Sequence, residues 1–239
     1  MKKFKGILYL FLLFFYSGTI HAQNSYDSAY IKAVAVYTKA IGVNAHLYNG
    51  SEYIDYDHRI TGNPFFGDLY FTSGSIVFDG ILYTDVKMFY DILNDDVVIK
   101  NYNDTALLLA KNKISSFTFA GHYFIRVSAD SSDAEIKSGF YEVLYDGRTK
   151  LFAKRKKEIT EKIALQYSES SFTEHNDYYI LKNDIFYPAN DKGSALNVMK
   201  NKKSELTKFI HQNKLKFKKT LEFSLIKTVA YYDSLNSAQ

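Results

Sequence analysis

The feature that most constrains this fold is the texture of residues 50–188. Short runs of Val, Ile, Phe and Tyr alternate there with turn-forming Gly, Asn and Asp residues. β-branched and aromatic residues favour pleated, half-buried strands, and Asp-Gly or Asn-Asp pairs supply the positive φ angles that tight hairpins need. The stretch therefore predicts many short antiparallel strands that follow one another as a meander.

Two tripeptides carry the plainest hairpin signals. Phe78-Asp79-Gly80 and Tyr145-Asp146-Gly147 each lie between apolar runs, and each is typical of a two-residue hairpin loop. Softer turns are expected at Asn94-Asp95-Asp96, Ala120-Gly121 and Lys182-Asn183-Asp184. So many short strands must curl or close to protect their edges, so we expect a strongly curved sheet, a roll or half-barrel, with a sandwich as the second choice.

Two segments alternate with a period of two residues. In residues 122–127 and 150–155, successive side chains are expected on opposite faces of a strand, with one face in contact with water. A basic run, Lys154–Lys157, begins at the end of the second segment. It could contact phosphates or acidic headgroups, but protection of a strand end against edge pairing is the simpler interpretation.

Helices are expected before and after the strands in the sequence. Residues 27–41 carry apolar side chains at spacings of three and four, which favours one N-terminal helix. Similar patterns around Leu206–Ile210 and Leu221–Tyr232 predict two to three C-terminal helices. The predicted class is therefore α+β, with residues 23–189 forming the N-terminal helix and β domain, and residues 190–239 forming a helical segment packed on it.

The first 22 residues have the pattern of a cleavable signal peptide. Lysines precede a short apolar run, Ile7–Tyr16, and Ala22 offers a small residue at the cleavage point. The run is too short to span a bilayer, so no transmembrane segment is expected after cleavage. The protein is accordingly predicted to be exported, to the periplasm or the exterior. It has no cysteine, so disulfides cannot stabilise the fold and a lipid cannot be attached to an N-terminal cysteine.

Charge argues against nucleic acid as a partner. Without the three signal-peptide lysines, the Lys and Arg residues nearly balance the 26 acids. The distribution is uneven, because residues 190–239 hold ten lysines and four acids. This excess is typical of a solvated helical face. A docking surface for anionic envelope components, or for the acidic part of the same chain, is the alternative.

One segment gathers groups that could perform chemistry. Asp55, Tyr56, Asp57, His58 and Arg59 place two carboxylates, an imidazole and a guanidinium in one loop-like stretch, which could bind an anion or a divalent ion. An ordinary polar loop with internal ion pairs is the structural alternative. The chain shows no phosphate-binding loop, no nucleophile elbow and no metal-type histidine spacing, and no cofactor or metal is predicted.

Aromatic content suggests how the protein could bind. The chain has 21 Tyr and 19 Phe but no Trp, and aromatic side chains on a sheet either fill a core or form a recognition surface. We therefore predict a non-catalytic envelope protein that binds a protein partner or an apolar ligand through a curved, aromatic-rich sheet. The alternative is a hydrolase or metal-dependent enzyme that uses Asp55, Asp57 and His58.

Several segments together resemble a group of exported proteins of unknown function that is common in Bacteroidetes. The resemblance lies in the signal ending His21-Ala22-Gln23 and in four further stretches: Asn49–Tyr53, Phe78–Tyr83, Gly139–Gly147 and Lys203–Leu235. It implies a cell-envelope setting and conveys no established activity.

Overall fold

The structure is a computed structural model of the 239-residue chain. It describes residues 32–33, 36, 46–67, 71–128, 136–163 and 168–237. The predicted signal peptide lies outside these residues. The same holds for nearly all of the helix predicted over residues 27–41.

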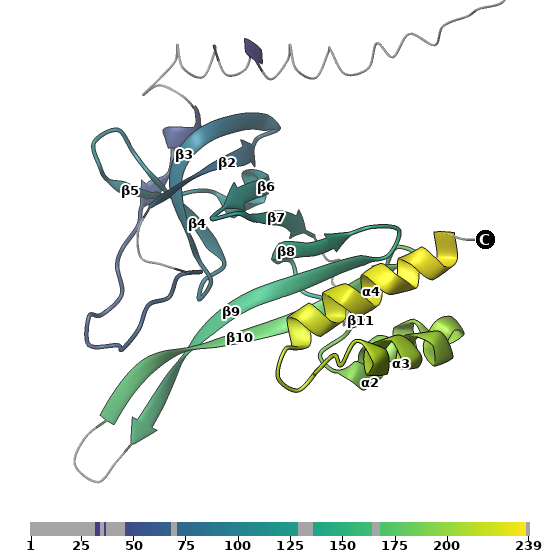
Figure 1. The fold of residues 1–239 in the computed structure, drawn as a ribbon. Helices are drawn as coiled ribbons and strands as arrows, with labels where there is room; N and C mark the ends of the chain where they lie inside the picture. Colours follow the sequence, from purple (N-terminus) through teal and green to yellow (C-terminus); the bar gives the residue numbers. More distant parts are fainter. Residues whose placement is uncertain are drawn as a thin grey trace, which may run out of the picture.

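Eleven strands form a single antiparallel sheet in the order β1-β5-β4-β3-β2-β6-β7-β8-β9-β10-β11 (Figure 1). Strands β1 and β11 are the two edges, so the sheet does not close. An antiparallel β-rich fold is thus confirmed, and the sandwich is wrong because all the strands belong to one sheet. The strands are β1 (Ser51–Glu52), β2 (Thr72–Phe78), β3 (Ile81–Asp91), β4 (Asp96–Lys100), β5 (Ala106–Leu108), β6 (Ile114–Phe119), β7 (His122–Val127), β8 (Gly139–Asp146), β9 (Lys150–Ile163), β10 (Ser168–Lys182) and β11 (Ile185–Pro188).

The hairpin turns follow the local sequence closely. Both residues of Asp79-Gly80, Ala120-Gly121 and Asn183-Asp184 have positive φ, as a two-residue turn of this hand requires. The turn at Asp146-Gly147 also reverses the chain, but its predicted length is wrong. Asp146 pairs with Lys150, which leaves a three-residue loop.

The sheet curls strongly around an aromatic core. Tyr90 on β3 and Phe124 on β7 are three places apart in the strand order, which in a flat sheet would separate them by roughly 14 Å. Their ring centroids are 5.1 Å apart. Phe140 on β8 lies 6.0 Å from Tyr90 as well, so the strands bend back over one face. We call this cluster the aromatic core; its largest fully buried members are Phe78, Tyr90, Phe117, Phe124 and Phe140.

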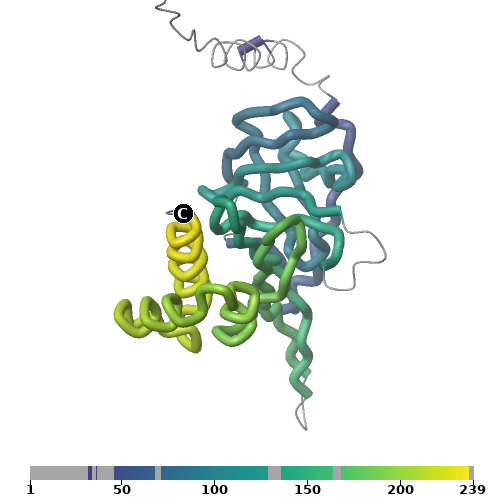
Figure 2. The backbone as a smooth tube through the Cα atoms, turned by 90° about the vertical axis from the view of Figure 1, so that its right-hand side faces the viewer, coloured from purple at the N-terminus to yellow at the C-terminus, as the bar shows by residue number. Residues whose placement is uncertain are grey.

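Three C-terminal helices build a second core, which confirms the prediction of two to three. They are α2 (Lys192–Val198), α3 (Lys203–Gln212) and α4 (Leu221–Ser237), with short 3-10 turns at η2 (His46–Tyr48), η3 (Lys111–Lys113) and η4 (Lys200–Lys202). The helices lie together on one side of the molecule, away from the curled strands (Figure 2). Their buried residues Leu206, Leu225 and Val229 pack with Leu151 and Ile180 of the sheet. We call this cluster the aliphatic core.

Strand β9 corrects two predictions. Leu151, Phe152 and Ala153 are all buried, so neither face of this part of the strand contacts water. The basic run does not act as an exposed edge either: it lies just beyond the β8 pairing, which ends at Ala153, and there the N–H of Lys157 bonds to Ile92 O at 3.1 Å. Lys154 and Arg155 are instead buried. The sequence pattern is ambiguous here because a helix layer covers one face and a separate apolar cluster covers the other.

Residues 122–127 likewise have no uniformly wet face. Phe124 is buried in the aromatic core, and Val127 is buried in the separate cluster on the opposite face. Tyr123, by contrast, is exposed. The period of two is correct, but both faces are partly covered.

Candidate binding site

One irregular segment, residues 53–66, crosses between distant parts of the sheet. We call it the crossing segment. Its first residue, Tyr53, donates its backbone N–H to Ala106 O at 3.0 Å. In its middle, Thr61 forms an isolated bridge with Ser171 on β10. At its end, Phe65 bridges to Asp91 at the end of β3. The crossing segment therefore ties β5, β10 and β3 together.

Local sequence features make this path possible. Gly62 has a φ of +95°, a conformation that other residues rarely adopt, and it follows the bridge at Thr61 directly. Asn63 accepts the N–H of Phe65 through its side-chain oxygen at 2.9 Å, which tightens the turn after the glycine. Lys157 on β9 then donates to the same oxygen at 3.0 Å and to Phe65 O at 2.6 Å. Lys157 thus fastens the crossing segment to the sheet.

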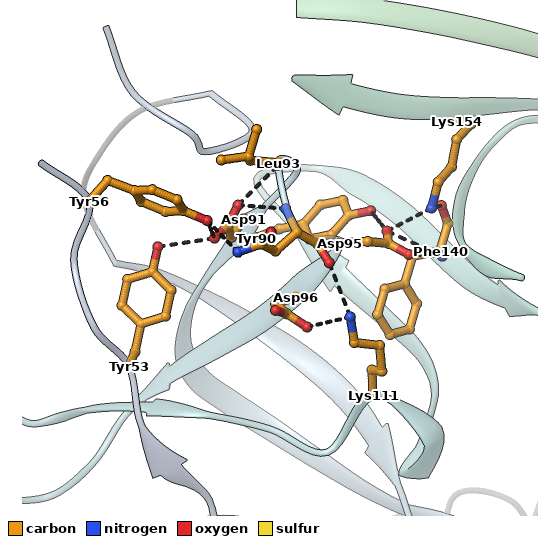
Figure 3. Close-up of polar contacts among 11 residues, drawn as sticks. Tyr53, Tyr56, Tyr90, Asp91, Leu93, Asp95, Asp96, Lys111, Phe140 and Lys154 are labelled. Carbon is orange, nitrogen blue, oxygen red and sulfur yellow. Dashed lines mark hydrogen bonds and ion pairs between the residues drawn. The ribbon is translucent and has the colours of Figure 1, made fainter. Parts of the chain in front are cut away.

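A buried carboxylate anchors the start of the crossing segment. Asp91 is fully buried, and its Oδ2 accepts hydrogen bonds from the hydroxyls of Tyr53 at 3.1 Å and Tyr56 at 2.8 Å (Figure 3). Its Oδ1 accepts the backbone N–H groups of Leu93 at 2.9 Å and Asn94 at 3.2 Å. Both oxygens are therefore hydrogen-bonded, as a buried carboxylate requires.

The two tyrosines act as fixed donors. Burial raises the pKa of both Tyr53 and Tyr56, and the neighbouring carboxylate of Asp91 raises the pKa of each further. Their phenols therefore stay protonated well above neutral pH. Tyr56 therefore presents its ring to the surroundings while its hydroxyl stays bound to Asp91.

The other two acids of this turn are also paired. Asp95 forms an ion pair with Lys154 at 2.7 Å and accepts the Tyr90 hydroxyl at 2.5 Å. Asp96 pairs with Lys111 at 2.8 Å, although burial raises the pKa of its carboxyl. These contacts serve the aromatic core and the β3–β4 turn. They leave no acid of the turn open to a ligand.

A pocket of about 430 Å³ lies along the crossing segment. Its volume falls within the range typical of small-ligand sites. The walls combine aromatic rings with polar and charged side chains. The lining residues are Asp55, Tyr56, Asp57, His58, Ile60, Gly62, Asn63, Pro64, Phe65, Phe71, Phe89, Ala106 and Phe172.

Four of the five predicted site residues line this pocket. Asp55, Tyr56, Asp57 and His58 do so, whereas Arg59 does not. Arg59 instead holds Asp57 through a backbone N–H and its guanidinium, with an Nη2–Oδ2 distance of 2.5 Å. These hydrogen bonds lower the pKa of the Asp57 carboxyl to about 2. The predicted polar loop with an internal ion pair is thus present, and it forms one side of a pocket.

The hydrolase or metal-dependent alternative depends on how Asp55, Asp57 and His58 are arranged. No group of three His, Asp or Glu side chains that could hold a metal ion occurs among the described residues. A general base works best with a pKa near the working pH, and the pKa of Asp57 is far below it. Asp55, Asp57 and His58 do line one pocket, but among the described residues no hydrogen bond joins these three side chains to one another.

The aromatic walls could not be assembled from the sequence. Phe65, Phe71, Phe89 and Phe172 come from the crossing segment, its continuation, β3 and β10. Asp91 was also missed as the anchor. The only local sign of its role is that Asp95 and Asp96 lie close by in the sequence, and these two residues predict no more than a turn. The pairing of β3 with a loop far upstream has no local signature.

Comparison with known proteins gives no family for this chain, since no family model, no curated protein and no solved structure matches it. In the part of the chain that the structure describes, no helix combines the length and apolar character needed to cross a membrane.

Proposed function

We propose that this protein is an exported, non-catalytic binding protein of the cell envelope that takes an apolar ligand into the pocket beside the crossing segment. The observation that carries this proposal is the pocket itself, whose volume of about 430 Å³ is lined by four phenylalanines and one tyrosine. Concave sites with mainly aromatic walls and a few polar groups are typical of ligand binding.

The walls are well supported for such a role. Phe65 and Phe89 lie 4.5 Å apart between ring centroids, and Phe71 lies 4.8 Å from Phe89. Phe172 meets the ring of Tyr56 edge-on at 5.7 Å. Because Tyr56 is held by Asp91, the rings are positioned before any ligand arrives, which lowers the entropic cost of binding.

A neutral fluorescent probe tests the site. We expect 1-N-phenylnaphthylamine to bind the purified protein with increased fluorescence and a 1:1 stoichiometry. Phe172→Ala should weaken binding by about ten-fold, because it removes one aromatic wall. Phe223→Ala is the matched control, since Phe223 is exposed on α4 and lies outside the pocket lining. Equal binding by both variants, or no binding by the wild-type protein, would refute the proposal.

The export part needs its own test. The lysines and apolar run of residues 1–22, together with the resemblance to exported Bacteroidetes proteins, support it. Expressed with its full sequence in a Gram-negative host, the protein should be found in the periplasm or medium with Gln23 as its first residue. Intact-mass measurement of the recovered protein checks this, and recovery of the uncleaved chain from the cytoplasm would contradict it.

A further inference from the structure

We propose that the ligand of this pocket carries a positively charged organic ammonium group beside its apolar body. This inference rests on the proposed function and narrows it to one chemical class. It is carried by the combination of aromatic walls and a carboxylate that has no cation of its own.

Asp55 is the central residue of the argument. It lines the pocket and is exposed, and no ion pair or hydrogen bond engages its carboxylate within the described part of the chain. Asp57 also lines the pocket, but Arg59 neutralises it. The pocket lining therefore includes one carboxylate that is paired and one, Asp55, that can meet a ligand.

The aromatic rings that line the same pocket suit a cation. An ammonium group is attracted to the face of an aromatic ring within about 6 Å of its centroid. One wall already makes such a contact with the chain itself, because Lys100 Nζ lies 5.9 Å from the centroid of Phe71. That lysine is not free to fill the pocket, since it also pairs with Asp104 at 2.9 Å.

Buried charges next to the pocket offset each other. The carboxylate of Asp91 accepts the Tyr56 hydroxyl at 2.8 Å, at the oxygen end of that ring. Lys157 donates to Asn63 and to Phe65 O, and Asp91 opposes the lowering of the Lys157 pKa by burial. The preference for a cation therefore rests on Asp55 and on the aromatic rings, not on the buried charges.

Three competitors of similar shape test the charge preference. Phenyltrimethylammonium, tert-butylbenzene and benzenesulfonate would each be used to displace 1-N-phenylnaphthylamine from the wild-type protein. We expect the ammonium compound to bind on the order of ten-fold more tightly than the neutral one, and the sulfonate to bind most weakly. If the three compete equally, the probe site stands and the ammonium inference fails. If the probe itself does not bind, the proposed function fails with it.

Two substitutions should change the affinity in opposite directions. Asp55→Asn should weaken ammonium binding by about three-fold, and Arg59→Gln should strengthen it by a similar factor, because it frees the Asp57 carboxylate. Binding of tert-butylbenzene should be unchanged in both variants. A gain of affinity cannot arise from misfolding, so Arg59→Gln protects the test against a simple folding defect.

A matched control separates the pocket from total charge. Glu205→Gln removes one carboxylate from the exposed surface of α3, outside the pocket lining, and should leave the affinity of phenyltrimethylammonium unchanged. If Glu205→Gln weakens binding as much as Asp55→Asn does, the preference reflects overall charge and the inference is overturned.

Discussion

The aromatic core and the aliphatic core share one sheet but are enclosed by different means. The aromatic core is enclosed by curvature, since rings from β3, β6, β7 and β8 meet over one face of the same sheet. The aliphatic core is enclosed by a second layer, in which three helices cover the end of β8 and the strands that follow it. Where the sheet curls, the crossing segment joins β5, β10 and β3, and the pocket lies along that segment. The helix layer has a pocket of its own, of about 510 Å³, between the β10–β11 hairpin and α2, but polar side chains such as Lys182, Asn183 and Lys200 line it in place of phenylalanines.

The strongest test of this comparison is to remove a ring from the aromatic core. Phe124 is stacked on Phe117 at 4.8 Å and lies 5.4 Å from Phe66 of the crossing segment. We expect Phe124→Ala to lower the free energy of unfolding by about 3–5 kcal/mol, measured by urea denaturation.

The same variant should also weaken the binding of 1-N-phenylnaphthylamine, because the crossing segment packs on this ring. Val229→Ala in the aliphatic core is the comparison variant, and it should lower stability while the folded protein retains its affinity for the probe. Loss of affinity in both variants would show that the two cores are not separable.

The boundary between the cores holds buried charge. Glu142 on β8 accepts Arg155 Nε at 2.6 Å and pairs with His122, and Arg155 also pairs with Glu222 of α4 at 2.7 Å. Despite burial, these carboxylates raise the pKa of the Arg155 guanidinium. The network therefore joins the curled sheet to the helix layer through one buried cation.

Glu142→Gln should therefore cost roughly 3 kcal/mol of stability, because it leaves Arg155 buried with a single carboxylate partner. Glu222→Gln, whose side chain is 35% exposed, should cost clearly less. Thermal unfolding of the two variants measures the difference. Equal costs would mean that burial does not distinguish the two ion pairs.

The attachment of the helix layer gives a smaller effect. Asp233 of α4 accepts the backbone N–H of Thr149 at 2.9 Å, in the loop between β8 and β9. We expect Asp233→Ala to cost about 1–2 kcal/mol, since it leaves a buried N–H without an acceptor. Hydrogen exchange should accelerate in α3 and α4 while the amides of β2 to β7 keep their protection. Uniform acceleration would show that the two regions open together.

Local signals in the sequence predicted much of this fold. Asp79-Gly80, Ala120-Gly121 and Asn183-Asp184 specify their turns through the φ angles that their residues tolerate, and the spacing of Leu225, Val229 and Tyr232 marks the buried face of α4. Such features depend on neighbours in the chain and can be found without a structure.

Features that depend on distant partners could not be predicted. Lys154 and Arg155 looked like a solvated strand end because Asp95, Glu142 and Glu222, which make their burial possible, lie far away in the sequence. The site shows the same division. Its polar loop at residues 55–59 is local and was found, whereas its aromatic walls come from elements that meet only in the folded chain.

The exposed ion pair of the crossing segment completes the comparison with the buried pair at the boundary. Hydrogen bonds from the side chain and the backbone N–H of Arg59 lower the pKa of Asp57 to about 2, so in Arg59→Gln, which keeps the backbone N–H, the pKa should rise toward its ordinary value of 3.8 without reaching it. Because the folded-state pKa is depressed, any stabilisation from the pair is present above the ordinary value and is lost as the pH falls through about 2. The change in stability should be small since both groups are exposed, unlike the change in Glu142→Gln. Carbon-detected NMR of the Asp57 carboxyl gives the midpoint directly, and a midpoint that does not move in Arg59→Gln would show that the pair does not hold in solution.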